Sequence, residues 1–153
     1  MAAMYKAHRY LTVHSITIDS FTPSVCEALL NHPPPGTANI AIHHAHGLAT
    51  EPNLNAAFPI RRRHLVLLIQ GDARVGVDPA EKEAAFAWAA DLHRELRSRG
   101  VALNQGCWSF TAPEFCDASF FFGEERVRRL KVLKERYNPG DAFPLAYPVL
   151  GGF

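Results

Sequence analysis

Four segments of the chain have the hydrophobic pattern of β-strands. Residues 8–18 (HRYLTVHSITI) are rich in β-branched and aromatic side chains in loose alternation. Residues 38–46 form a second such segment, closed by Gly47. Residues 62–70 contain the run LVLLI, which is apolar at consecutive positions and therefore predicts a central strand, buried on both faces. Residues 101–108 predict a fourth strand.

Between these strands lie segments whose apolar residues recur with the spacing typical of helices. Thr22 and Pro23 supply an N-cap and a proline at the first helical position. The apolar stripe of this short helix is expected to consist of Val25, Leu29 and Leu30, and the helix stops at the prolines of 33–36. The sequence therefore predicts a helix between the first and second strands.

Two further helices are expected. Residues 78–99 begin with an Asp-Pro pair that caps the helix, and Gly100 stands past its end. One face of this helix carries Ala85, Trp88, Ala89, Leu92 and Leu96. A charged helix is predicted over 124–137, ending at Asn138-Pro139-Gly140 and followed by a proline-containing tail.

The order β-α-β-β-α-β predicts an α+β fold of the ferredoxin-like type, an antiparallel sheet with helices on one face. A C-terminal helix and tail follow it. With 153 residues the chain has the length of one domain. We expect residues 1–153 to form that single domain, in which 1–110 are the α/β sandwich and 111–153 the C-terminal helix and tail.

Composition and charge narrow the function classes. Hydrophobic residues make up 48% and charged residues 20%, as in ordinary globular proteins. Lys and Arg (16) nearly balance Asp and Glu (15), which argues against a nucleic-acid partner. No apolar run approaches the ~20 residues that span a bilayer, and no secretory signal is evident, so no membrane association and a cytoplasmic location are expected. Cys26, Cys107 and Cys116 are unclustered, which suits reduced thiols.

The stretch AIHHAHG at 41–47 places three imidazoles within four residues. Strand alternation puts His44 and His46 on one face and His43 on the other. The register decides which set His14 and His64 join. A His-x-His pair with a third imidazole is typical of a zinc or copper site, but no carboxylate or thiol stands at a recognisable spacing. The alternatives are histidines held in the sheet by hydrogen bonds and histidines that act as acids, bases or substrate-orienting groups.

We take His44 and His46 as the candidate catalytic residues, with no metal. Asn104 is a third catalytic candidate, able to donate a hydrogen bond to a carbonyl oxygen, or else a sheet-edge residue. Expected substrate-binding residues are His14, His64, Arg61 and Trp108. Arg61 can hold an anionic or carbonyl oxygen, although three consecutive arginines are more often a solvated strand entrance. The phenylalanines of 120–122 are expected in a core or a subunit interface.

Several short motifs resemble a known family. FFGEERVRRLKVLKERYNPGDAF is similar to the C-terminal signature of berberine-bridge-enzyme-like FAD-linked oxidases, a branch of the vanillyl-alcohol-oxidase flavoproteins. The matching positions are Phe122-Gly123, Arg129-Leu130, Lys134, Tyr137-Asn138-Pro139 and Phe143. Upstream, Ala57-Phe58-Pro59-Ile60-Arg61 resembles the family's Ala-Phe-Pro-His-Arg, and Leu103-Asn104 resembles its Tyr-x-Asn strand.

The sequence also departs from the family. Ile60 stands where the family has histidine, and Asn138 where it has aspartate. No glycine-rich pyrophosphate loop follows a strand, and the scattered glycines are expected to be structural. The resemblance implies that this chain corresponds to the last part of the substrate-binding domain, whose helix-free sheet face looks towards a flavin held elsewhere.

Three classes of function follow from these observations. The first is a flavin-independent enzyme of secondary metabolism, a homodimer without cofactors that performs a cyclisation, pericyclic reaction, isomerisation or dehydration of a hydrophobic oxygenated small molecule. Some members of the resembled family perform cycloadditions, which favours this class by analogy. The alternative is one subunit of a split oxidoreductase whose FAD is supplied by a partner chain, or a non-catalytic binding protein.

Overall fold

The computed structural model describes residues 9–52, 60–103, 107, 110 and 117–138. The first half of the described chain contains β1 (Arg9–Ile18), α1 (Pro23–Asn31), β2 (Asn39–Ala45) and the 3₁₀ turn η1 (Gly47–Thr50). It continues with β3 (His64–Arg74), α2 (Pro79–Ser98), β4 (Ala102–Leu103), α3 (Ala118–Phe122) and α4 (Glu124–Tyr137). Up to β4 the order of strands and α-helices is the predicted β-α-β-β-α-β.

The strands form one sheet in the order β2-β3-β1-β4, with every neighbouring pair antiparallel. This is consistent with a ferredoxin-like arrangement and confirms the predicted fold class. β3 lies inside the sheet, as the run LVLLI predicts. It extends past the predicted end at Gln70 to Arg74, because β1 pairs with it over the whole stretch from Arg9 to Ile18.

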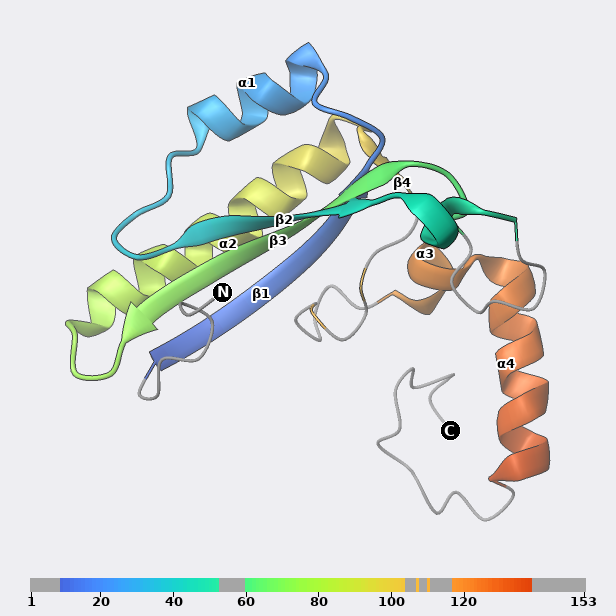
Figure 1. Ribbon diagram of the computed structural model, residues 1–153. Coiled ribbons are helices and arrows are strands. Elements are labelled where there is room, and N and C mark those ends of the chain that lie inside the picture. The colour runs from blue at the N-terminus through green and yellow to red at the C-terminus, as the bar shows by residue number, and fades with distance from the viewer. Residues whose placement is uncertain (1–8, 53–59, 104–106, 108–109, 111–116, 139–153) are drawn as a thin grey trace.

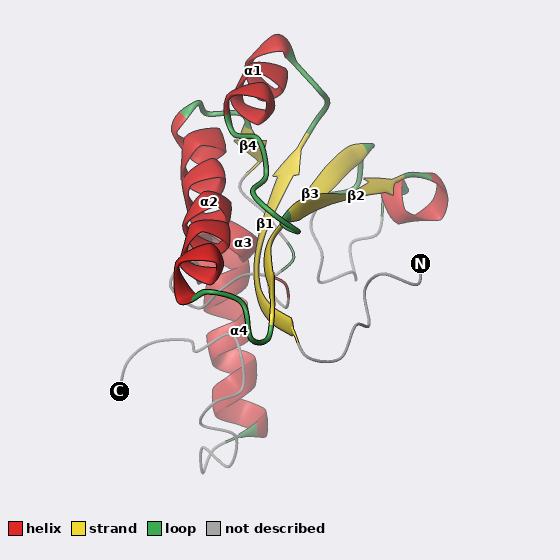
Figure 2. Ribbon diagram, turned by 90° about the vertical axis from the view of Figure 1, so that its left-hand side faces the viewer, coloured by secondary structure: helices red, strands yellow, loops and turns green. Residues whose placement is uncertain are grey.

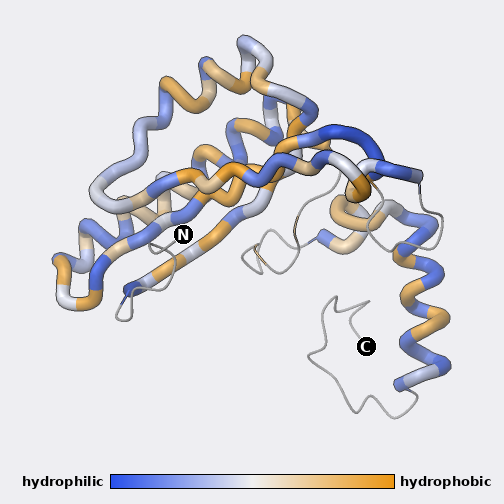
Figure 3. The backbone as a smooth tube through the Cα atoms, viewed as in Figure 1, coloured by the Kyte–Doolittle hydropathy of each residue, from blue (hydrophilic) through white to orange (hydrophobic). Residues whose placement is uncertain are grey.

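Helices α1 and α2 lie on the same side of the sheet, which we call the first face (Figures 1 and 2). Alternate residues of the strands point to this face and pack against the helices to form the hydrophobic core. The core side chains with exposed fractions of 0% include Ile16, Ile18, Leu67, Ile69, Ala89, Leu92 and Leu96. Figure 3 shows hydrophobic stretches, in orange, along the strands and α2.

Helix α1 begins as predicted, with the Thr22 hydroxyl accepting a hydrogen bond from the Val25 N–H at 3.3 Å. Its predicted apolar stripe was wrong at one position. Leu30 is 80% exposed, and Ala28, at 0%, takes the buried place. Successive helical residues are about 100° apart, so Leu30 lies some 140° around the helix from Val25 and faces solvent.

Beyond the sheet, the described chain adds a short helix that the sequence pattern did not predict. In α3 the Asp117 carboxylate accepts hydrogen bonds from the N–H groups of Ser119 and Phe120. Phe121 is 2% exposed, and the Arg97 guanidinium of α2 stacks 4.1 Å from the centre of the Phe120 ring. Two of the three phenylalanines expected in a core or interface thus attach α3 to α2 and its surroundings.

Helix α4 has the predicted bounds and projects away from the sheet (Figure 1). Its residues are predominantly hydrophilic (Figure 3), and of its described residues only Val127 is buried. Of the strand predicted over 101–108, Ala102 and Leu103 are described as strand, and the tail after Asn138 lies outside the described residues. Among the described helices, none has the length and apolar character needed to cross a membrane.

Candidate functional site

The face of the sheet opposite α1 and α2, here called the second face, carries several polar side chains. Register and alternation place on it Val13, Ser15 and Thr17 of β1, His64, Val66, Leu68 and Gln70 of β3, and Ala41, His43 and Ala45 of β2. Ser15 and Thr17 are 0% exposed, His64 is 3% and Gln70 is 9%. Four polar side chains are thus buried on this face, where each needs a hydrogen-bond partner.

His64 is the predicted site residue that this face contains. It opens β3, opposite Ala45, and its Nδ1 lies 2.7 Å from the carbonyl oxygen of Arg62. Because a carbonyl oxygen only accepts, Nδ1 carries the hydrogen, and the neutral ring therefore has Nε2 as its proton-accepting atom. The imidazole is thus held in one tautomer, as a general base requires.

The polar neighbours of His64 were not among the sequence-based candidates. Thr17, Val66 and His43 form one cross-strand row on the second face, directly beside the row that contains His64. The Thr17 hydroxyl is buried without a hydrogen-bond partner in the described part of the chain. Strand alternation could have predicted that these residues share a face with His64, but only if the pairing register of the strands had been known.

Ser15 has a different role. Its hydroxyl donates to the carbonyl oxygen of Cys107 at 2.9 Å and accepts from the Cys107 N–H at 2.8 Å. These two bonds fasten the chain at Cys107 to the side chain of Ser15. The backbone of Cys107 therefore has a structural role. Cys26 is exposed and forms no disulfide.

His44 and His46, the predicted catalytic pair, lie together but away from His64. Their ring centroids are 5.2 Å apart, tilted by 53°, and both side chains are exposed. His44 pairs with Leu65, a position of the first face, where β2 forms the edge of the sheet. The two imidazoles are therefore outside the second face.

His14 also faces the helices, because it pairs with Ile69 and packs against His93 of α2 with ring centroids 5.6 Å apart. Both side chains are 1% exposed. Burial, the neighbouring His14 and the charges of Arg97 and Arg94 lower the pKa of His93 from 6.5 to about 4. The two imidazoles form a pair inside the core, and the structure does not bring His14 together with His44 or His64.

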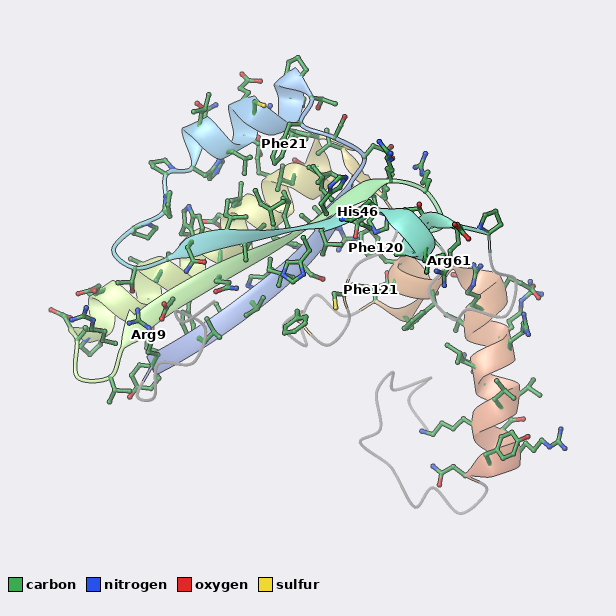
Figure 4. The ribbon with its side chains drawn as sticks, in the orientation of Figure 1. Arg9, Phe21, His46, Arg61, Phe120 and Phe121 are labelled. Carbon is green, nitrogen blue, oxygen red and sulfur yellow. The ribbon has the colours of Figure 1, made fainter. Side chains whose placement is uncertain are left out.

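Arg61 binds a backbone oxygen rather than standing free at the strand entrance. Its guanidinium donates to the carbonyl of Ala49 at 3.1 Å and thereby holds η1 against the start of β3. Arg62 pairs with Asp19 at 3.0 Å on the surface. Figure 4 shows His46 and Arg61 near the end of the sheet where α3 lies, with Arg9 at the opposite end.

The remaining two candidates, Asn104 and Trp108, lie outside the described residues. Within the described chain no three His, Cys, Asp or Glu side chains are grouped closely enough to hold a metal ion. A shallow depression on α4 is lined by Glu125, Arg128, Arg129, Val132 and Leu133. It is formed by a single helix and is not a candidate active site.

Comparison with known proteins agrees with the resemblance at a coarse level. No protein-family model matches the chain. The chain is 28% identical over 137 residues to the FAD-linked oxidoreductase aurO of Gibberella zeae, an alignment that covers 88% of this chain and 26% of that protein. The chain thus spans about a quarter of the length of the curated relative that it matches, and it is related in sequence to an FAD-linked oxidoreductase.

Proposed function

We propose that this chain supplies the substrate-facing sheet of an FAD-linked oxidoreductase, while polypeptide outside these 153 residues holds the flavin. The observation that carries the proposal is the similarity to an FAD-linked oxidoreductase along 88% of the chain. The narrower proposal, that this oxidoreductase belongs to the berberine-bridge-enzyme-like branch, is supported by the sequence motifs at residues 57–61, 103–104 and 121–143. The buried polar side chains of the second face are the groups that would meet a hydrophobic, oxygenated substrate.

The amino ends of α2 and α4 do not fit the pyrophosphate of FAD. A dinucleotide is held by a glycine-rich turn at a helix N-terminus, whose N–H groups and dipole attract phosphate. Here α2 begins with the Asp78 carboxylate bound to the Ala80 N–H and carries Glu81 in its first turn, and α4 begins with Glu124 and Glu125. These acidic groups repel phosphate, so the nucleotide would have to be bound by another part of the assembly.

The second face offers hydrogen bonding without redox chemistry, because side chains do not accept hydride. His64, fixed by the Arg62 carbonyl, can accept a proton from a bound hydroxyl or carbon acid, and the Thr17 hydroxyl can donate to a carbonyl oxygen. We therefore expect these two residues to position the substrate against the flavin.

A second candidate function is the flavin-independent cyclase, pericyclase or isomerase, with a homodimer as the acting species. It is favoured by the fixed tautomer of buried His64, which can perform proton transfer without any cofactor. The catalytic roles predicted for His44, His46 and Asn104 belong to this candidate and stay predictions.

One experiment separates the two. The tagged full chain is purified under mild conditions from the cells that make it, and the visible absorbance of the assembly is recorded. The same chain, made alone, is titrated with FAD while flavin fluorescence is followed. We expect a yellow, flavin-containing assembly and no fluorescence change with the isolated chain. A colourless assembly, or an isolated chain that binds FAD, would contradict the proposal, and a colourless chain that converts a pathway intermediate alone would establish the second candidate.

A further inference from the structure

The exposed pair His44 and His46 has a geometry that the proposed function does not use. Both residues have extended backbone, His44 within β2 and His46 with φ −152° and ψ 177°, so alternation turns both side chains to the same side. Their rings are 5.2 Å apart. Neither ring forms a hydrogen bond with the residues that the structure describes, so the nitrogens face solvent.

The separation of the two rings agrees with chelation of a tetrahedral metal ion. With a zinc–nitrogen distance of about 2.0–2.1 Å and a ring centre about 1.1 Å beyond the nitrogen, an angle of about 109° places two ring centres roughly 5.2 Å apart. A square-planar ion, with an angle of about 90°, requires roughly 4.5 Å. The observed 5.2 Å between the ring centres is thus the separation that a tetrahedral ion requires.

We propose that His44 and His46 bind a zinc ion at the edge of the sheet. Imidazole nitrogen is a preferred ligand of Zn²⁺, and an exposed strand edge lets water fill the other two positions. Within the described chain no third metal-binding side chain stands close enough to join them. The site thus has two protein ligands and binds more weakly than a complete structural zinc site.

The same strand contains a control residue. His43 directly precedes His44 in β2 and is also exposed, but alternation turns it to the second face, where it pairs with Val66. It has the chemistry and exposure of the pair, but the imidazole beside it on the second face, His64, is only 3% exposed and is bound through Nδ1 to the Arg62 carbonyl. If zinc binds between the two imidazoles that point to the same side of β2, binding requires His44 and His46 but does not require His43.

The test is a calorimetric titration of the full chain with zinc chloride at pH 7.5. We expect one zinc ion per chain, a loss of at least about tenfold in affinity for H44A and for H46A, and a change within about twofold for H43A. All three substitutions are at exposed positions, and unchanged circular dichroism will confirm that the variants are folded.

Three results would overturn the proposal. They are no zinc binding by the parent chain, unchanged binding by H44A and H46A, or a loss in H43A equal to that in H44A. None of these outcomes depends on flavin or on turnover. The zinc site therefore stands or falls separately from the proposed function.

Discussion

Individual residues of this protein owe their properties to the face on which they lie. His64, His44 and His14 are chemically identical, yet one is fixed by the Arg62 carbonyl, one is exposed at an edge and one is packed against His93. Only the first has both burial and a set tautomer on the second face. Its chemistry therefore follows from position rather than from residue type.

The buried His93 predicts a pH dependence of stability. Its pKa is about 4 in the folded chain and near 6.5 when unfolded, so between these values the unfolded chain binds more protons. Stability from this group is complete above pH 6.5 and falls as the pH decreases towards 4. A shift of this size corresponds to at most about 3 kcal/mol. Chemical denaturation at pH 7.5, 6 and 4.5 will measure it.

The control for this prediction is H93Q, which removes the titrating group but keeps a polar side chain. His14, Arg94, Arg97 and the Ser15 backbone surround His93 and remain in the variant. We expect the variant to be less stable at pH 7.5 and to lose less stability between pH 7.5 and 4.5. An unchanged pH profile in H93Q would show that another group causes the dependence.

At the scale of elements, β3 and α2 approach each other closely at Gly71. A Cβ added to Gly71 would lie 2.6 Å from the carbonyl oxygen of Ala85 and 2.8 Å from the Thr12 methyl. Backbone cannot yield as a flexible side chain can, so the glycine is required by the helix crossing. This explains why a strand of eleven residues contains a glycine near its middle.

Gly71→Ala should therefore destabilise the fold by about 1–3 kcal/mol, because α2 must move away from the sheet. Gly47→Asn is the matched control. Gly47 has a φ of +61°, which asparagine tolerates, and no atom lies within 4 Å of its added Cβ. Thermal unfolding followed by circular dichroism should show a change within about 0.5 kcal/mol for the control. If Gly71→Ala is as stable as the parent chain, the space between Gly71 and the Ala85 carbonyl oxygen must be large enough for a methyl group.

At the scale of the whole molecule, stability is distributed unevenly. β1 and β3 pair over ten residues and lie against α2, whereas α4 packs chiefly on α3 within the described part of the chain. Most side chains of α4 are exposed, including Val132 at 63% and Tyr137 at 72%. Local opening is easiest where few apolar contacts hold an element.

Hydrogen exchange should follow this gradient. Amides of β3 between Leu67 and Ile69 are expected to exchange at least about a hundredfold more slowly than those of α4 between Lys131 and Arg136. Mass spectrometry of the intact, unliganded chain measures both segments in one experiment, so each serves as the control of the other. Equal protection would show that α4 is held as firmly as the sheet.

The sequence by itself determined the elements. Alternation, the caps Thr22-Pro23 and Asp78-Pro79, and the turn at Asn138-Pro139 are local signals, and they predicted the ferredoxin-like order and the bounds of α2 and α4 closely. Helix α3 was not predicted, because five residues are too few to show a helical hydrophobic period. Leu30 was wrongly predicted to be buried, because in a helix of nine residues more than one apolar stripe is compatible with the sequence.

Only the tertiary structure decided which residues meet. A shift of one residue in strand register moves every side chain to the opposite face, and no local pattern reports the register between distant strands. The pairing of His14 with Ile69 and of His64 with Ala45 therefore separated histidines that look equivalent along the chain, and it placed Thr17 and His43 beside His64.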